Sequence, residues 1–206
     1  MKQTGEQLLF QLKSRGPQSA ATLAAACAIT PMGAHKQLQA LQEQGLVDAE
    51  DQVQGPGRPK RIWRLSAAGH GRFPDRHGEL AVQLIRQTAA VLGEQALDRL
   101  ITAREQEMLA AYAGRLQGAR SLQARVQRLA ELRAEEGYLA RVEKAGKAWL
   151  LIEDHCPICA AASACQGFCR SELSLFTQLL GEGVRVERSE HLLAGARRCA
   201  YRISPA

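Results

Sequence analysis

Four of the six cysteines in this chain fall within fourteen residues, and a fifth follows thirty residues after the last of them. These five are Cys156, Cys159, Cys165, Cys169 and Cys199. The cluster constrains the fold, because a metal or a disulfide can join only thiols that the chain brings together. Three chemistries use such clusters: a thiolate-bound metal or iron–sulfur centre, a dithiol redox switch, and structural disulfides. We therefore expect the C-terminal region to bring Cys199 close to the earlier cysteines.

Length and composition indicate which of these chemistries fits. A chain of 206 residues forms one large domain or two small ones, and 46% hydrophobic with 23% charged residues is ordinary for a soluble globular protein. No apolar run approaches the roughly 18 residues of a membrane span. Residues 1–6 lack the charged-then-apolar pattern of a signal peptide. We expect a cytoplasmic protein with no membrane partner, where structural disulfides are rare and metal or redox chemistry is favoured.

Positive charge gathers in the N-terminal third. Residues 1–72 carry nine Lys or Arg and five Asp or Glu, which gives +4 of the chain's net +6. The excess is densest in residues 58–64, Arg-Pro-Lys-Arg-Ile-Trp-Arg. A basic patch confined to one region favours a polyanionic partner, with DNA as the first candidate. A solvated run of surface charge is the alternative interpretation.

The N-terminal third has the pattern of a helix-turn-helix. The sequence predicts a helix from about Thr4 to Lys13, a short helix capped by Ser19, and a third helix from Thr30-Pro31 to about Gln44. Apolar residues at positions 34, 38 and 41 define the buried side of the third helix. Its other side and flanks are the candidate DNA contacts. These are Thr30, Met32, Gly33, His35, Lys36, Gln37 and Gln39.

A basic hairpin follows the third helix. A strand begins at Leu46-Val47, residues 51–60 are rich in Gly and Pro, and residues 61–65 alternate as a second strand. This pattern predicts the wing of a winged helix, with Arg58, Lys60 and Arg61 near the phosphate backbone or minor groove. We interpret Trp63 as a core residue of the wing instead of a base-stacking group. Cys27, alone in an alanine-rich helix, is interpreted as a small core residue.

Residues 73–136 predict three amphipathic helices, the first capped by Asp75 and ending at Gly93. Helices of this kind after a winged helix suit a homodimer that reads a palindromic operator, although simple packing on the C-terminal domain is equally compatible. Their charged side chains are expected to be solvated. These are Arg104, Glu105, Glu107, Arg125, Arg128, Arg133, Glu135 and Glu136.

Residues 137–206 predict a small α/β unit. Strands are expected at 138–142 and 147–152, a helix at 171–180, and strands at 184–187 and 198–203. Pro157 favours a helix start, and a helix continuing through residues 160–164 would place Cys165 and Cys169 on one face. The predicted fold class is thus α+β. Its three regions are a winged helix-turn-helix (1–72), dimerisation helices (73–136) and a cysteine-rich metal-cluster domain (137–206).

The number of candidate ligands exceeds what one centre needs. A tetrahedral zinc ion or an iron–sulfur cube takes about four ligands. The chain offers five clustered cysteines with His155 and His191 nearby. One or two cysteines are therefore expected to be spare. We expect each histidine to lie at the surface or to support a ligand instead of binding directly.

Several of these features resemble the SufR family of iron–sulfur-dependent winged-helix repressors. The similarity is carried by Gly57-Arg58-Pro59, Trp63-Arg64-Leu65, the Cys-x12-Cys pair of Cys156 and Cys169, and Cys199-x-Tyr-x-Ile. It implies a regulator of iron–sulfur cluster biogenesis with ligands Cys156, Cys169 and Cys199 to a cluster, expected as 4Fe-4S. Cys159 and Cys165 are additional, so the resemblance leaves the fourth ligand open. It also implies that the cluster-bound dimer binds operator DNA and releases it when the cluster is lost or oxidised.

Other interpretations remain. The same cysteines would serve a structural Zn²⁺ site or a thiol–disulfide switch in a winged-helix regulator. Cys156-Pro157-Ile158-Cys159 has the C-x-x-C form of thioredoxin-like redox enzymes, but no βαβ pattern precedes it. The sequence has neither a Gly-rich nucleotide loop nor a credible Ser/His/Asp set. We therefore do not expect an enzyme.

Overall fold

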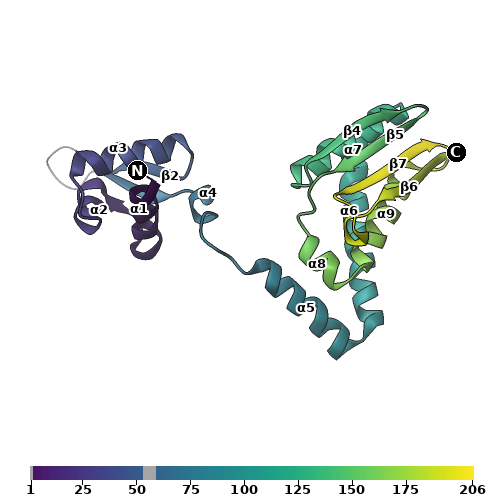
Figure 1. Ribbon diagram of the computed structural model, residues 1–206, viewed down its shortest axis with the longest axis horizontal. Helices are drawn as coiled ribbons and strands as arrows, with labels where there is room; N and C mark the ends of the chain where they lie inside the picture. Colours follow the sequence, from purple (N-terminus) through teal and green to yellow (C-terminus); the bar gives the residue numbers. More distant parts are fainter. Residues whose placement is uncertain (1, 53–58) are drawn as a thin grey trace. The chain divides into compact units, whose positions relative to one another are not determined.

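The computed structural model describes residues 2–52 and 59–206. The chain forms two compact units, Met1–Asp75 and Arg76–Ala206, whose elements are drawn in Figure 1. The sequence predicted the helices of residues 73–136 and the cysteine-rich residues 137–206 as two separate regions. In the structure, both belong to the unit that begins at Arg76. Both units combine helices with antiparallel strands, so the fold class is α+β.

The N-terminal unit has the element order of a winged helix. Its helices are α1 (Lys2–Arg15), α2 (Ala20–Ala26), α3 (Pro31–Glu43) and α4 (Ala67–His70), and its strands are β1 (Gln18–Ser19), β2 (Val47–Gln52) and β3 (Lys60–Leu65). The described strands form an antiparallel sheet in the order β1-β3-β2. The two-residue strand β1 was not expected from the sequence, because two residues leave no periodic pattern.

The predicted helix starts are confirmed by their caps. Ser19 Oγ accepts a hydrogen bond from Thr22 N at 3.2 Å, and Thr30 Oγ1 accepts one from Gly33 N at 3.1 Å. Each cap satisfies a backbone donor that the first helical turn leaves without a partner. Between the two helices Ala28 adopts a left-handed φ of 53°. The tight turn between α2 and α3 is built there.

One core holds α1, α2, α3 and the hairpin together. Trp63 is completely buried in it, as predicted. Cys27 is half-buried and packs against this core instead of within it. The buried members are Leu8, Leu9, Leu12, Leu23, Ala24, Ala34, Leu38, Leu41, Val47, Trp63 and Leu65.

A glycine in α4 permits a close backbone approach and provides a stability test. A Cβ on Gly69 would lie 2.0 Å from the carbonyl oxygen of Leu46, whereas a Cβ on Gly71 would meet nothing nearer than 3.5 Å. Gly69→Ala is expected to destabilise the N-terminal unit by about 1–3 kcal/mol, because backbone cannot move aside as a flexible side chain does. Gly71→Ala is the matched control. Urea unfolding of both variants measures the difference, and equal midpoints would contradict the expected clash.

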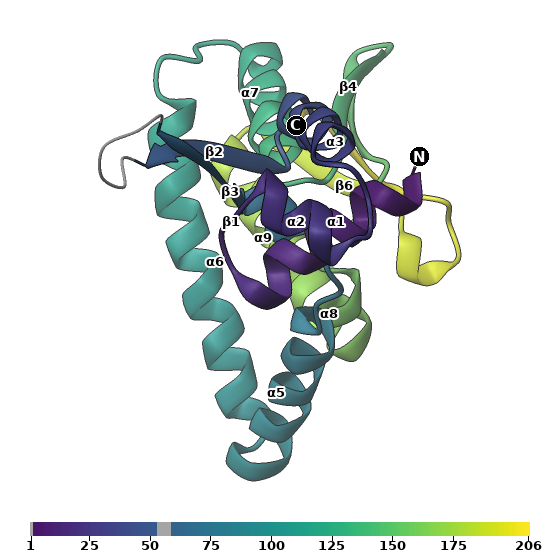
Figure 2. The same cartoon turned by 90° about the vertical axis from the view of Figure 1, so that its left-hand side faces the viewer.

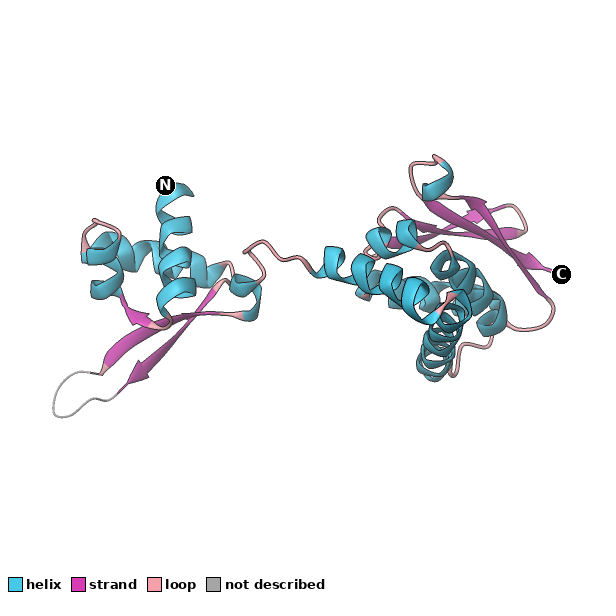
Figure 3. Cartoon of the chain, turned by 90° about the horizontal axis from the view of Figure 1, so that it is seen from below, coloured by secondary structure: helices cyan, strands magenta, loops and turns pink. Residues whose placement is uncertain are grey.

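The C-terminal unit places helices against one antiparallel sheet. Its helices are α5 (His77–Leu92), α6 (Glu94–Leu116), α7 (Leu122–Glu135), α8 (Cys159–Ala164), α9 (Gly167–Leu180) and the 3-10 turn η1 (Leu192–Ala194). Its strands are β4 (Ala140–Ala145), β5 (Ala148–Glu153), β6 (Val184–Glu190) and β7 (Cys199–Pro205), in the order β4-β5-β7-β6. Within this unit, α7 packs on β4 and β5 and α9 packs on β6. Figure 3 distinguishes the helices of the chain from its strands by colour.

Helices α5 and α6 form a hairpin that bends at Gly93, where φ is 86° (Figure 2). The predicted end of the first helix is thereby confirmed. Its predicted start is wrong, because α5 begins at His77 with Arg76 instead of Asp75 at the N-cap position. All residues of α5 are described and none is fully buried, while Leu80, Leu84 and Val91 are more than half exposed. Among the described residues, no helix is both long and apolar enough to cross a membrane.

Two expectations about the C-terminal unit are wrong. Cys165 and Cys169 do not share one helix: α8 ends at Ala164, Cys165 is extended with φ −148°, and α9 begins at Gly167. Arg133, expected at the solvated surface, has no exposed area. Arg104, Glu105 and Arg125 are half-buried as well.

Candidate functional site

The exposed face of α3 has the composition expected of a DNA-reading helix. Met32, Lys36 and Gln39 lie along one side of the helix and are exposed, and Met32 reaches 78%. Thr30 and Gly33 form the N-terminal cap. Gln37 is half-buried on one flank. The first turn of the helix, residues 31–34, carries no charged side chain, which suits close approach to a groove.

The other flank of α3 meets the base of the wing. The His35 ring packs edge-on against Trp63, with 5.9 Å between ring centroids, and the Arg61 guanidinium lies 5.1 Å from the Trp63 ring centroid. His35 and Arg61, with Asp51 and Pro59, line a hollow of about 400 Å³. The structure thus brings α3 and the basic strand β3 to one surface.

Not every predicted cation is available on this surface. Lys60 and Arg61 are exposed at the start of β3. Arg64, four residues after Lys60 on the same face of the strand, pairs with Glu50 at 3.3 Å. Its charge is thereby largely compensated. Arg58 lies outside the described residues.

Four of the five clustered cysteines come together from separate segments. Cys156 precedes α8, Cys159 begins it, Cys169 lies in the first turn of α9, and Cys199 begins β7. All are free thiols. Cys159 N donates to the carbonyl oxygen of Cys156 at 3.1 Å, and the backbone N–H of Leu192 donates to the sulfur of Cys199.

Burial and nearby charges shift the pKa values of three of these thiols. Burial, and then the charge of Glu172, raise the pKa of Cys156 to about 12 and that of Cys169 to about 11. Burial also raises the pKa of Cys199. The charges of Cys159 and Cys199 act on both Cys156 and Cys169 in the same direction. Without a bound cation the buried thiols therefore stay protonated at neutral pH, a state in which they are poor nucleophiles.

Cys165 faces a different part of the unit. It lines a hollow of about 370 Å³ together with Ile85 and Ala89 of α5 and Leu97 of α6. Cys156, Cys159, Cys169 and Cys199 are not among the residues that line this hollow. The structure therefore separates it from Cys156, Cys159, Cys169 and Cys199, a distinction that the sequence left open.

The two histidines differ in their surroundings. His155 is exposed. His191 is half-buried, and its Nε2 finds no hydrogen-bond partner among the described residues. Burial and the nearby Arg188 lower the pKa of His191, so the ring is neutral at physiological pH.

Within residues 2–52 and 59–206, no three His, Cys, Asp or Glu side chains are arranged to hold a metal ion. The donor chemistry of the four neighbouring thiols nevertheless fits a thiolate-bound centre in both number and type. To share one centre, their side chains would have to move closer together than they lie in this structure.

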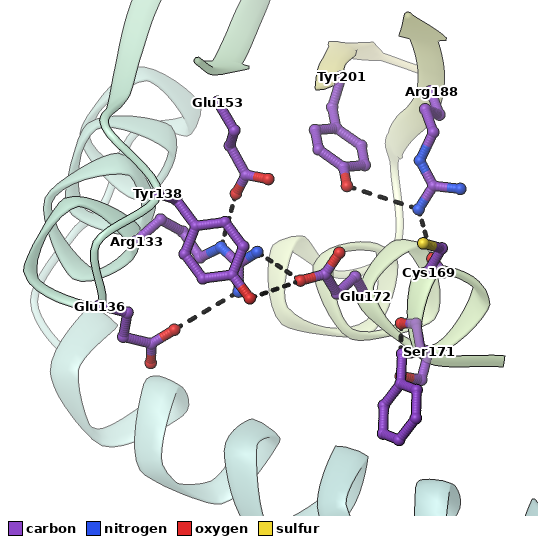
Figure 4. A network of polar contacts seen from close by, with 10 residues as sticks. Arg133, Glu136, Tyr138, Glu153, Cys169, Ser171, Glu172, Arg188 and Tyr201 are labelled. Carbon is purple, nitrogen blue, oxygen red and sulfur yellow. Dashed lines mark hydrogen bonds and ion pairs between the residues drawn. The ribbon is translucent and has the colours of Figure 1, made fainter. Parts of the chain in front are cut away.

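Sequence reasoning missed a charged cluster buried beside these thiols. Arg133 Nε donates to Glu153 Oε1 at 2.6 Å, Arg133 Nη2 donates to Glu172 Oε1 at 2.5 Å, and the Tyr138 hydroxyl donates to the same Glu172 oxygen at 2.9 Å. Figure 4 shows this cluster next to Cys169. A signal for it existed, because Arg133 follows Val126 by seven and Leu129 by four residues. It therefore lies in the middle of the apolar stripe of α7.

The cysteine-bearing loop also touches the first helix of its unit. A Cβ on Gly78 of α5 would lie 3.8 Å from Ala160 Cβ of α8, and α8 packs along α5. Helix α5 is the first element after the N-terminal unit. The segment that carries Cys156 and Cys159 is thus in contact with the helix through which the chain continues from that unit.

Two solved structures of winged-helix regulators are partly similar to this chain. A scan against models of protein families finds no match to this chain, and no curated protein matches it. A MarR family regulator from Neisseria meningitidis has 19% sequence identity, with 52% of this chain and 72% of that chain covered and a TM-score of 0.31. PadR from Bacillus subtilis, solved in complex with operator DNA, has 13% identity, with 85% and 94% covered and a TM-score of 0.33. At these scores neither similarity assigns a fold or a function, and the winged helix is identified by the chain's own elements and caps.

Proposed function

We propose that this protein is a DNA-binding transcription regulator whose operator affinity is set by a thiolate-bound inorganic centre. The observation that carries the proposal is geometric: Cys199 begins the strand that pairs with Glu153, three residues before Cys156, and Glu153 is joined through Arg133 to Glu172, one helical turn after Cys169. These cysteine-bearing segments lie in the unit that follows a winged helix along the chain. A cytosolic protein has few other uses for such a group of buried thiols.

Support for DNA binding comes from the winged-helix surface. An α-helix fits the major groove of B-DNA, and the exposed side chains of α3, Met32, Lys36 and Gln39, face away from the core. Lys60 and Arg61 extend the positive surface along the wing, where phosphate contacts position a protein on duplex DNA.

Support for the centre comes from its donors. Cys156, Cys169 and Cys199 match the ligand positions that the resemblance to SufR-type repressors implies, and Cys159 supplies a fourth thiol beside them. All-thiolate ligation is usual for 4Fe-4S clusters and also occurs for structural Zn²⁺. A bound iron–sulfur cluster would supply a link between segments that oxygen or oxidants can break.

The contact between α8 and α5 provides the route to DNA. Ligation would require Cys156 and Cys159 to approach Cys169 and Cys199, which would move the loop before α8. Because α8 packs on α5, this movement would be passed on to α5. The exposed apolar residues Leu80, Leu84 and Val91 of α5 suit a homodimer, which would match a palindromic operator. Loss of the link would change operator affinity by a typical coupling free energy of about 1–3 kcal/mol. Repression of iron–sulfur biogenesis genes is the role that the resemblance implies.

A thiol–disulfide switch is less favoured. Oxidation to a disulfide begins from the thiolate, and the raised pKa values of Cys156, Cys169 and Cys199 keep these thiols protonated. Zinc is the second candidate for the centre, because the same four donors suit it.

The proposal is tested by purifying the protein without oxygen and measuring iron, sulfide and zinc per chain. Operator fragments selected from random duplex DNA are then used in shift assays with loaded and metal-free protein. We expect iron and sulfide with visible absorption, and tighter DNA binding by the loaded form. Protein that is colourless and free of zinc, or DNA binding that ignores loading, would contradict the proposal.

Lys36→Ala tests the DNA surface separately. Loss of this exposed α3 cation is expected to weaken operator binding about tenfold and to lower the salt dependence by the equivalent of one phosphate contact. Lys13→Ala removes the same charge from α1 of the same unit and serves as the control. Metal content should not change in either variant. Equal DNA affinity of the two variants would exclude α3 as the recognition helix.

A further inference from the structure

One guanidinium inside the C-terminal unit contacts several elements at once. Arg133 of α7 bonds to Glu153 at the end of β5 and to Glu172 of α9, and its guanidinium carbon lies 3.3 Å from the ring centroid of Tyr138. Arg133 is 0% exposed, and Tyr138, Glu153 and Glu172 are each 5% or less exposed. We call these four residues the Arg133 cluster (Figure 4).

Each carboxylate of the Arg133 cluster belongs to a cysteine-bearing segment. Glu153 pairs with Cys199 in the register of β5 and β7, and it lies three residues before Cys156. Glu172 follows Cys169 by three residues on α9, one helical turn along the same face. The guanidinium therefore ties together the segments that carry Cys156, Cys169 and Cys199.

Tyr138 adds two more bonds to this arrangement. Its hydroxyl donates to Glu172, while its carbonyl oxygen accepts a hydrogen bond from the backbone N–H of His155 at 3.1 Å. His155 immediately precedes Cys156. Just before Tyr138, a Cβ on Gly137 would lie 3.8 Å from Pro157 Cβ, so the loop on both sides of Cys156 lies against this turn.

We propose that Arg133 is the positioning residue of the cysteine site, holding the Cys156, Cys169 and Cys199 segments at the spacing from which their sulfurs can meet. The identity of the ligand rests on the function proposed above, but the positioning of the thiols does not. A planar guanidinium bonds two carboxylates in different directions at once, which a lysine ammonium on a flexible stem does not reproduce. Groups that orient ligands in this way typically change metal affinity by about 10- to 100-fold when they are removed.

The experiment compares Arg133→Lys and Tyr138→Phe with Arg125→Lys. Arg125 lies two turns earlier on α7 and donates to the carbonyl oxygen of Leu180, at the far end of α9 from Cys169. Each metal-free full-length variant is titrated with Co²⁺, whose sulfur charge-transfer absorption reports thiolate ligation. We expect Arg133→Lys to weaken Co²⁺ binding about 10- to 100-fold and Tyr138→Phe about tenfold, with Arg125→Lys unchanged. Wild-type affinity in both cluster variants would overturn the proposal.

A second measurement needs no metal. In a Cys159→Ser, Cys165→Ser background, phenylarsine oxide forms two As–S bonds, with loss of water, only where two of Cys156, Cys169 and Cys199 can meet. We expect slower capture in Arg133→Lys and Tyr138→Phe than in Arg125→Lys. If Arg133→Lys does not fold, the comparison of capture rates between Tyr138→Phe and Arg125→Lys tests the positioning role alone.

The two measurements distinguish failure of the inference from failure of the proposed function. The metal centre would be rejected if the wild-type chain does not bind Co²⁺. If Arg133→Lys nevertheless slows arsenical capture relative to Arg125→Lys, the positioning role would still be supported. Equal arsenical capture in the cluster variants and the Arg125→Lys control would reject the positioning role, whether or not the wild-type chain binds metal.

Discussion

Cys199→Ser is expected to abolish metal loading of the C-terminal unit. Cys199 is the thiol that β7 brings to the site, and its position opposite Glu153 in the sheet register places it beside segments more than forty residues earlier. A serine hydroxyl is a poor ligand for iron or zinc, and the three remaining thiols all come from residues 156–169. We expect affinity for the centre to fall by more than about 100-fold, beyond the loss typical of supporting groups.

Iron, sulfide and visible absorption measured after oxygen-free purification report this loss. Cys165→Ser is the matched control, because Cys165 lines the hollow beside α5 and α6 and should leave loading unchanged. The N-terminal unit has its own core, so Cys199→Ser should retain the DNA affinity of the metal-free form. Full colour in Cys199→Ser, or its loss in Cys165→Ser, would show that the ligand set is assigned incorrectly.

The N-terminal unit could be predicted closely because its signals are local. Ser19 and Thr30 are caps whose hydrogen bonds go to residues three positions away, and Trp63 lies in a strand with clear alternation. Local signals of this kind survive tertiary packing. The exposed face of α3 followed from the same periodicity, since Ala34, Leu38 and Leu41 are buried opposite it.

The cysteine site could be predicted in part. The sequence identified the clustered cysteines but did not show which of them lie close together. Cys165 lies in the two-residue break between α8 and α9, so it does not share a helix face with Cys169. The alanine-rich run does form helix α8, as its propensity favours, but the helix ends at Ala164 and the chain is extended at Cys165 before α9 begins at Gly167.

Arg133 was missed for a different reason. Charged residues on amphipathic helices are usually solvated, and its carboxylate partners lie 20 and 39 residues away in sequence. Its position in the apolar stripe of α7 was visible, but the partners that make burial of a charge tolerable come from β5 and α9. Only the tertiary structure shows that burial and pairing occur together.

Arg133→Met is expected to have the largest effect on stability. Removing the guanidinium leaves Glu153 and Glu172 buried without their cation, a change that typically costs about 3–5 kcal/mol. Arg125→Met removes one hydrogen bond to a backbone oxygen and should cost only about 1–2 kcal/mol. Urea unfolding of the metal-free chain measures both. The transition that belongs to the C-terminal unit is identified as the one that Gly69→Ala does not shift.

The cost of Arg133→Met should depend on pH. Burial already raises the pKa of Glu153 in the folded protein, and Arg133 opposes that rise. Without Arg133 the folded-state pKa moves further above its unfolded value, so the folded variant binds the proton more tightly than the unfolded chain does. Its stability relative to wild type should therefore recover as pH falls from 8 toward 5 and decline as pH rises. Adding Glu153→Gln and Glu172→Gln should restore most of the loss at pH 8, because no unpaired buried charge remains. A cost that stays constant with pH, or that the neutral substitutions leave in place, would mean that Arg133 acts through packing alone.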